Sequence, residues 1–233
     1  MGSIVEKHLL RLAMPKTWKI KRKGIKYVSR PKSGPHSFKL GLPINLLLRD
    51  ILNYARTTKE VKNILYNQDI LVDGIRRKNH RFIVGLMDVI SIPKTKENFR
   101  IILNKKGNIA ALPIKEEEAK LKPCKIIGKT LLKKGKMQLN MEDGKNIPTK
   151  EDKYNVGDSI LIEIPSQKIK EVFKLEKGST VYLTGGKHIG ETGLIEGIKE
   201  NRLVYKREQE TFETSKNYAF VIGKEKPSIE LTK

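Results

Sequence analysis

The amount and distribution of positive charge constrain this chain more than any other feature of its sequence. Its 233 residues include 48 lysines and arginines against 26 aspartates and glutamates, a formal net charge of +22. Residues 1–41 alone contain eleven basic residues and one acidic residue, Glu6. A surplus of this size opposes compaction unless a bound polyanion supplies the counter-charge. The sequence therefore predicts a polyanionic partner.

Length and composition favour several small folded parts. At roughly 100–150 residues per domain, the chain has room for two or three domains, and a hydrophobic content of 38% is enough for modest cores. The single cysteine, Cys124, excludes a disulfide framework and a zinc site of paired cysteines, and it favours a reducing, cytoplasmic setting. No apolar stretch is long enough to span a membrane, so we expect no membrane partner.

Residues 1–42 are predicted to form a basic, extended N-terminal arm. Glycines and prolines interrupt any helical pattern there, and Trp18, Tyr27 and Phe38 lie among the cations, where they can stack on bases or dock on a domain. We therefore expect the arm to be held mainly by its partner. The candidate RNA-binding residues of the arm are Lys7, Arg11, Lys19, Lys21, Arg22, Lys23, Lys26, Arg30 and Lys32.

Residues 43–104 have the pattern of two helices followed by a hairpin. One face of the first helix carries Ile44, Leu47, Leu48, Ile51 and Ala55, with Asn45, Arg49 and Asn53 off that face. Thr57 and Glu60 are spaced as a capping box that begins a second helix, with Val61, Ile64 and Leu65 facing inward. Asp73 and Gly74 suit a primed hairpin turn, and a strand follows at 89–92.

The stretch LLLRDILNYARTTKEVKNILYNQDILVDGIRRK, followed by GLMDVISI, resembles the small RNA-binding module named after ribosomal protein S-four. The resemblance implies that a helix pair and a hairpin form one basic face that contacts folded RNA. Arginine and lysine are also the side chains that neutralise phosphate and release counterions. The residues implicated are Arg49, Arg56, Lys59, Lys62, Arg76, Arg77, Lys78 and Arg81, with Gly74 as a structural glycine of the turn.

Residues 101–175 read mostly as short strands separated by turns, which predicts a small antiparallel β-barrel at 105–173. The predicted strands include 101–103, 138–141 and 159–164. Residues 115–119 have helix-forming composition over about two turns. The basic loop at 133–136 either contacts RNA or is a solvated turn.

In residues 174–233, the segment EKGSTVYLTGGKHIGETGLIEGI resembles a KOW motif, the strand–loop–strand signature of small SH3-like barrels. Gly186, Gly190 and Gly193 are candidate structural glycines that would permit positive φ, and Lys187 and His188 are candidate RNA contacts. Glu191 stands where a basic residue is common in the motif. The glycine spacing fits neither a phosphate-binding P-loop nor a dinucleotide fingerprint.

The whole chain resembles the small-subunit ribosomal protein S-four family of the archaeal and eukaryotic "e" type. The most specific segments are KHLLRLAMPKTWKI, RPKSGPH, VGLMDVISI, ENFRIILNKKG, QLNMEDGKNI, TGGKHIGETG and YAFVIGK. The resemblance implies an α+β multidomain fold: a basic extended N-terminal arm (1–42), a helix–helix–hairpin RNA-binding module (43–104), a small antiparallel β-barrel (105–173) and a C-terminal SH3-like (KOW) β-barrel (174–233). It further implies a structural constituent of the small ribosomal subunit that binds ribosomal RNA and neighbouring ribosomal proteins, with no cofactor and no small-molecule substrate.

Two alternatives use the same features. One is a KOW-containing transcription or translation factor. The other is a non-catalytic relative of an RNA-modifying enzyme that carries the same module. We expect no enzyme activity, because the sequence contains no nucleophile–base constellation, metal-ligand spacing or nucleotide loop. The histidines, His8, His36, His80 and His188, are far apart, and Cys124 is most simply a small buried hydrophobic residue.

Overall fold

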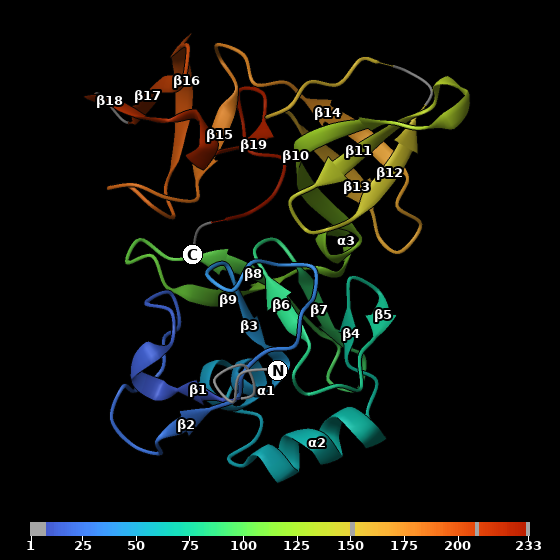
Figure 1. The fold of residues 1–233 in the computed structure, drawn as a ribbon, viewed down its shortest axis with the longest axis vertical. Coiled ribbons are helices and arrows are strands. Elements are labelled where there is room, and N and C mark those ends of the chain that lie inside the picture. Colours follow the sequence, from blue (N-terminus) through green and yellow to red (C-terminus); the bar gives the residue numbers. More distant parts are fainter. Residues whose placement is uncertain (1–7, 150–151, 208–209, 232–233) are drawn as a thin grey trace, which may run out of the picture. The chain divides into compact units, whose positions relative to one another are not determined.

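The computed structural model describes residues 8–149, 152–207 and 210–231, and the chain divides into two compact units (Figure 1). Unit 1 comprises the described residues up to Ile102 together with Asn108–Lys115. Unit 2 comprises Leu103–Gly107 and the described residues from Glu116 onward. The fold is mostly β with few helices, and each unit is described by itself.

Unit 1 is built from three small sheets and short helical segments. The five-stranded sheet has the order β5-β4-β7-β8-β9, and β1-β2 and β3-β6 form two-stranded sheets. Its elements are β1 (Leu9–Leu10), the 3-10 helix η2 (Arg11–Ala13), β2 (Tyr27–Val28), β3 (Gly41–Pro43), α1 (Ile44–Leu46), the π-helix η3 (Leu47–Ile51), α2 (Thr58–Asn67), β4 (Leu71–Val72), β5 (Ile75–Arg76), β6 (Ile83–Gly85), β7 (Val89–Ile92), β8 (Glu97–Leu103) and β9 (Ile109–Ile114).

Unit 2 consists of two five-stranded antiparallel sheets. Their strand orders are β12-β11-β10-β13-β14 and β18-β17-β16-β15-β19. The elements are α3 (Glu116–Ala119), β10 (Leu121–Leu131), the 3-10 helix η4 (Lys133–Gly135), β11 (Met137–Met141), β12 (Asn146–Thr149), β13 (Ser159–Glu163), β14 (Ile169–Phe173), β15 (Thr180–Leu183), β16 (Thr192–Lys199), β17 (Arg202–Arg207), β18 (Glu210–Ser215), the 3-10 helix η5 (Lys216–Tyr218) and β19 (Ala219–Gly223).

Local sequence signals account for the helix α2 and the hairpin that follows it. The hydroxyl of Thr57 accepts from the Glu60 backbone N–H at 3.2 Å, and the Glu60 carboxylate accepts from the Arg56 N–H at 2.8 Å. This is the expected capping box, with the carboxylate reaching one residue further back. Asp73 and Gly74 have φ of 50° and 74°, as a primed turn requires, so the predicted hairpin is confirmed.

The first predicted helix differs from expectation. Residues 44–46 form one α-turn, and 47–51 continue as a π-helix in which the Leu52 N–H donates to the Leu47 carbonyl. Ile44, Leu47 and Leu48 are buried as predicted. Asn45, expected off the buried face, is fully buried, because its side chain bonds to two other segments of unit 1.

The expectation that the N-terminal arm is extended and held by its partner is wrong for residues 8–41. Trp18 is only 3% exposed, and its indole N–H donates to the Gly41 carbonyl at 2.8 Å. Met14 is 4% exposed, and the Thr17 carbonyl accepts from the Ile109 N–H in β9 at 2.7 Å. Irregular backbone is present as expected, but the apolar side chains among the cations are sufficient to pack this segment into unit 1.

Unit 2 has two clusters of buried apolar residues, one of which involves both of its sheets. This cluster joins Leu161 and Phe173 of the first sheet to Val181, Leu203 and Val221 of the second. The other cluster lies within the first sheet and includes Cys124, which is 2% exposed. The strands predicted at 138–141 and 159–164 correspond to β11 and β13, and the short helix predicted at 115–119 corresponds to α3.

Candidate nucleic-acid interface

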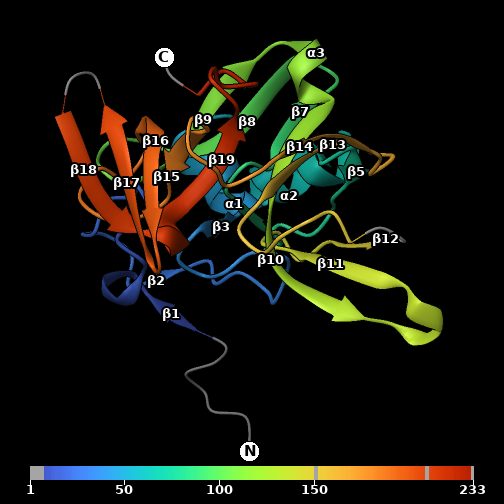
Figure 2. The ribbon, with the colours of Figure 1, turned by 90° about the horizontal axis from the view of Figure 1, so that it is seen from above.

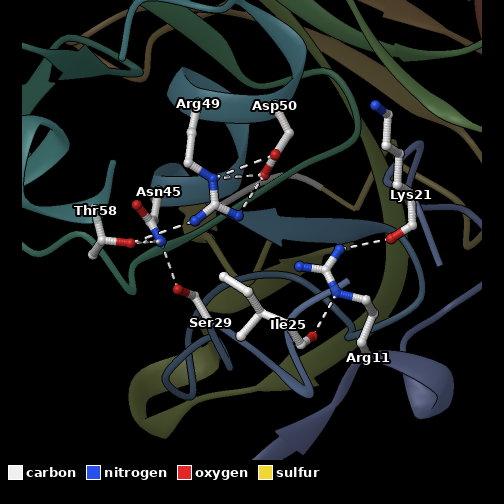
Figure 3. Close-up of polar contacts among 8 residues, drawn as sticks. All are labelled: Arg11, Lys21, Ile25, Ser29, Asn45, Arg49, Asp50 and Thr58. Atoms are coloured by element: carbon white, nitrogen blue, oxygen red, sulfur yellow. Dashed lines mark hydrogen bonds and ion pairs between the residues drawn. The ribbon is translucent and has the colours of Figure 1, made fainter. Parts of the chain in front are cut away.

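A loop at residues 19–26 carries a dense group of exposed cations in unit 1. The guanidinium of Arg11 bonds to the backbone of this loop, donating from Nε to the Ile25 carbonyl at 2.8 Å and from Nη1 to the Lys21 carbonyl at 2.6 Å (Figure 3). Arg22 donates to the Leu12 carbonyl at 3.3 Å. Arg11 therefore organises the loop backbone, while the exposed lysines are Lys19, Lys21, Lys23 and Lys26.

The buried side chain of Asn45 connects three segments of unit 1 that carry candidate residues. Its Nδ2 donates to the Ser29 hydroxyl at 2.5 Å and to the Thr58 hydroxyl, at the start of α2, at 3.3 Å (Figure 3). Its backbone N–H donates to the His80 carbonyl at 2.9 Å. This role was not predicted from the sequence. A polar residue inside the apolar run LPINLLL was the available signal, because a fully buried asparagine needs hydrogen-bond partners.

Three of the candidate cations gather around His80. Burial lowers the pKa of His80, and the nearby charges of Lys62, Arg81 and Lys32 lower it further, in that order. The Lys32 N–H donates to the Arg81 carbonyl at 2.9 Å, and the Arg81 Nε donates to the Arg30 carbonyl at 2.8 Å. The arm, α2 and the loop before β6 therefore bring their positive charges to one place. We call Lys32, Lys62, His80 and Arg81 the His80 cluster.

The remaining candidates of the helical segment differ in how they are held. Arg49 is half-buried, and its guanidinium pairs with the Asp50 carboxylate at 2.9 Å and lies 3.5 Å from the Thr58 hydroxyl (Figure 3). Arg56, Lys59 and Lys62 are exposed at and along α2. Hydrogen bonds from the Arg56 N–H and the Thr57 side chain lower the pKa of Glu60, which keeps the capping carboxylate charged.

The hairpin cations contact neighbouring side chains. Arg76 pairs with Asp69 at 2.7 Å and donates to the Tyr66 carbonyl at 3.1 Å. The Lys78 ammonium lies 5.7 Å from the Tyr66 ring, and the Arg77 guanidinium lies 4.3 Å from the Phe82 ring. Lys78 and Arg76 remain exposed, whereas Arg77 is half-buried. The structure thus places Arg76 and Lys78 next to Tyr66 of α2, and Arg77 against Phe82.

In unit 2, the predicted strand–loop–strand is present as β15, a glycine-containing loop and β16. Gly186 and Gly190 have φ of +88° and +78°, and a Cβ on Gly190 would lie 2.5 Å from the Asn104 carbonyl oxygen. Gly193 does not have positive φ. It is paired with Val181 in the sheet, and a Cβ there would meet Tyr205 Cδ2 at 2.6 Å. Glycine is required at position 193 because Tyr205 packs too closely to leave room for a side chain.

The two candidate contacts of this loop lie in different environments. Lys187 is exposed. His188 is half-buried: its ring centroid lies 4.3 Å from that of Phe212, and its Nδ1 lies 3.1 Å from the Glu191 carboxylate. Arg207 also pairs with Glu191. Glu191 thus joins the loop to β17, which gives a structural role to an acidic residue at a position where a basic one is common in the motif.

Lys7 lies outside the described residues. Within the described ranges, no group of three or more histidine, cysteine, aspartate or glutamate side chains is placed to hold a metal ion. No helix among those residues has both the length and the apolar character required to cross a membrane.

Comparisons with known proteins agree with one another. The "Ribosomal family S4e" matches residues 95–169, and the "RS4NT (NUC023) domain" matches residues 5–39. The chain is 45% identical to small ribosomal subunit protein eS4 of Methanosphaera stadtmanae, covering 99% of this chain and 97% of the relative. It is 43% identical to the eS4 protein of Methanocaldococcus jannaschii, covering 97% and 98%. The crystal structure of 30S ribosomal protein S4e from Thermoplasma acidophilum matches with a TM-score of 0.71 at 31% identity, covering 79% of this chain and 96% of that one.

Proposed function

Because the chain belongs to the eS4 family of small ribosomal subunit proteins, it is a structural ribosomal protein, and we propose that unit 1 binds ribosomal RNA through the His80 cluster and the 19–26 loop. The family accounts for a net charge of +22, since ribosomal RNA supplies the counter-charge that the protein lacks. It is not a family known for catalysis.

The convergence of Lys32, Lys62 and Arg81 around His80 is the observation that carries this proposal. The cations come from three segments that are distant in sequence, and their combined charge lowers the pKa of the histidine beyond the effect of burial. Within the part of the chain that the structure describes, no carboxylate is among the charges that shift this pKa. Cations gathered in this way form a site suited to the phosphates of a folded RNA backbone.

The proposal extends to further contacts and to the organisation of the chain. The exposed lysines of the 19–26 loop, the hairpin cations Arg76, Arg77 and Lys78, and Lys187 of unit 2 are proposed to contact further phosphates. The division into an N-terminal segment (1–42), whose residues 8–41 pack into unit 1, a helix–helix–hairpin module (43–104), a central barrel (105–173) and a KOW-type barrel (174–233) is likewise proposed, as is contact with neighbouring ribosomal proteins. The cytoplasmic ribosome is the proposed location.

Salt-dependent binding of the full-length chain to small-subunit ribosomal RNA tests the cluster. The double variant Lys32→Gln, Lys62→Gln should bind more weakly, and its salt slope should fall by about 0.7–0.9 for each phosphate that is no longer neutralised. The matched control is Lys94→Gln, Lys96→Gln, which removes the same charge from exposed positions of unit 1 between β7 and β8. If the two double variants have equal affinity and equal slope, the cluster is a solvated surface and the proposal is wrong.

A further inference from the structure

The hairpin formed by β10 and β11 projects from its sheet. The first half of β10 pairs with β13 from Leu121 to Lys125, and the second half pairs with β11 from Ile126 to Leu131. Figure 2 shows this ribbon running out beyond β13. At the tip, the Leu132 N–H donates to the Lys136 carbonyl at 2.7 Å, and Gly135 has φ of +68°. The short loop is therefore closed by a hydrogen bond, so binding would cost little ordering entropy.

The tip of this hairpin exposes aliphatic side chains. Ile127, at the bulge where the hairpin begins, is 54% exposed; at the tip, Leu131 is 75% exposed and Leu132 37%. On the opposite face of the ribbon, the Asn140 amide donates to the Thr130 hydroxyl and the Gln138 amide donates to Asn140, both at 2.9 Å. This ladder of side chains fixes the register of the two strands. The leucines are thus presented on an ordered element.

The positive charge of the hairpin favours a polyanionic partner. Between Glu118 and Glu142 the sequence has seven lysines and no acidic residue. Lys122, in the half of β10 that pairs with β13, forms an ion pair with Asp143, and Lys129, within the hairpin, forms one with Asp152. Lys133 and Lys136 at the tip are exposed. The two leucines at the tip are few for a protein interface, which typically buries more than about 1,000 Å². One or two are enough to pack against unstacked bases.

We propose that the β10–β11 hairpin is a separate RNA-contacting element, in which Leu131 and Leu132 pack against unstacked bases of ribosomal RNA while Lys133 and Lys136 bind the flanking phosphates. This inference rests on the proposed function and adds to it a defined surface of unit 2. Neither leucine was singled out from the sequence, because an exposed apolar pair is visible only once the strands are placed.

Directed hydroxyl-radical probing locates the tip. An iron chelate attached through Lys133→Cys in the full-length chain is bound to small-subunit ribosomal RNA, with the unsubstituted chain treated identically as background, since Cys124 is buried. Discrete RNA cleavages above background support the proposal. If the labelled chain binds but cuts no more than background, the hairpin inference is overturned and the proposed function stands. If no form of the chain binds the RNA, both are overturned.

Two double variants separate the apolar and ionic contributions. Leu131→Ser, Leu132→Ser should weaken binding about tenfold with the salt slope unchanged, because no charge is removed. Lys133→Gln, Lys136→Gln should lower the salt slope by about 0.7–0.9 per phosphate contact. The control, Lys168→Gln, Lys170→Gln, removes the same charge from exposed positions at the edge strand β14. If the hairpin variants bind like the control, the inference is overturned. It is also overturned if a cross-linker attached at the tip reacts only with protein when the chain is assembled into small subunits.

Discussion

Two glycines of strand β16 should respond in opposite directions to the same substitution. A Cβ added at Gly193 would lie 2.6 Å from Cδ2 of Tyr205 and 3.1 Å from the Lys206 carbonyl oxygen. At Gly197, four residues along the same strand, a Cβ would meet nothing within 4 Å, and the backbone is not in the left-handed region. Gly193→Ala and Gly197→Ala are therefore a matched pair that differs mainly in local packing.

The expected magnitudes follow from the neighbours of Gly193. Tyr205 is 1% exposed and its ring packs against Phe212 and His188, so it has little room to move away from a new methyl group. Overpacking of this kind costs about 1–3 kcal/mol. Gly197→Ala should instead stabilise unit 2 by about 0.4–1 kcal/mol, because alanine reduces the conformational entropy of the unfolded chain.

Hydrogen exchange of the β15 and β16 amides is the direct assay, because it reports the free energy of opening in unit 2 itself. Gly193→Ala should accelerate this exchange and Gly197→Ala should slow it. Exchange in α2 of unit 1 provides an internal check that the effect is local. Equal protection in the two variants would refute the argument that close contact with Tyr205 is what requires glycine at position 193.

Two further predictions concern unit 1. Since the folded state lowers the pKa of His80 below its ordinary value of 6.5, the unfolded state binds more protons below that pH. Stability should therefore fall as the pH drops below about 6.5. His80→Gln should reduce this loss, as measured by urea titrations at pH 7 and pH 5.5. An unchanged pH dependence in the variant would contradict a lowered pKa of His80 in the folded state. Asn45→Ala removes the side-chain donor to Ser29 and Thr58 and should lower the free energy of unfolding by about 1–3 kcal/mol. The control, Asn63→Ala on the exposed side of α2, should be nearly neutral. Equal urea midpoints for the two variants would exclude a stabilising role for the hydrogen bonds of Asn45.

Features determined by adjacent residues could be predicted from the sequence. The capping box of Thr57 and Glu60 and the Asp73–Gly74 turn each depend on residues within four positions of one another, and both are present. The burial of Val61 and Leu65 follows from helical periodicity in the same way. In these cases local chemistry and tertiary packing favour the same conformation.

Features determined by distant residues could not be predicted in this way. Trp18 docks through a hydrogen bond to Gly41 and through the contact of its neighbour Thr17 with Ile109, separations of 23 and 92 residues. Gly193 is required because of Tyr205, which approaches it only when β16 and β17 pair. Asn45 belongs to an apolar run, and its polar partners lie 13 and 16 residues away. None of these contacts leaves a periodic signal in the sequence.

The same distinction changes how the positive charge should be interpreted. Several candidate arginines use their guanidinium groups within unit 1: Arg11 holds two carbonyls of a loop, Arg49 pairs with Asp50, and Arg81 holds the Arg30 carbonyl. The planar, multi-donor guanidinium suits this internal role, whereas the flexible ammonium of lysine remains hydrated and mobile. The candidate lysines of unit 1 that the structure describes are exposed. The formal net charge therefore overstates the number of cations available to phosphates, because some of the arginines stabilise the fold that positions the exposed cations.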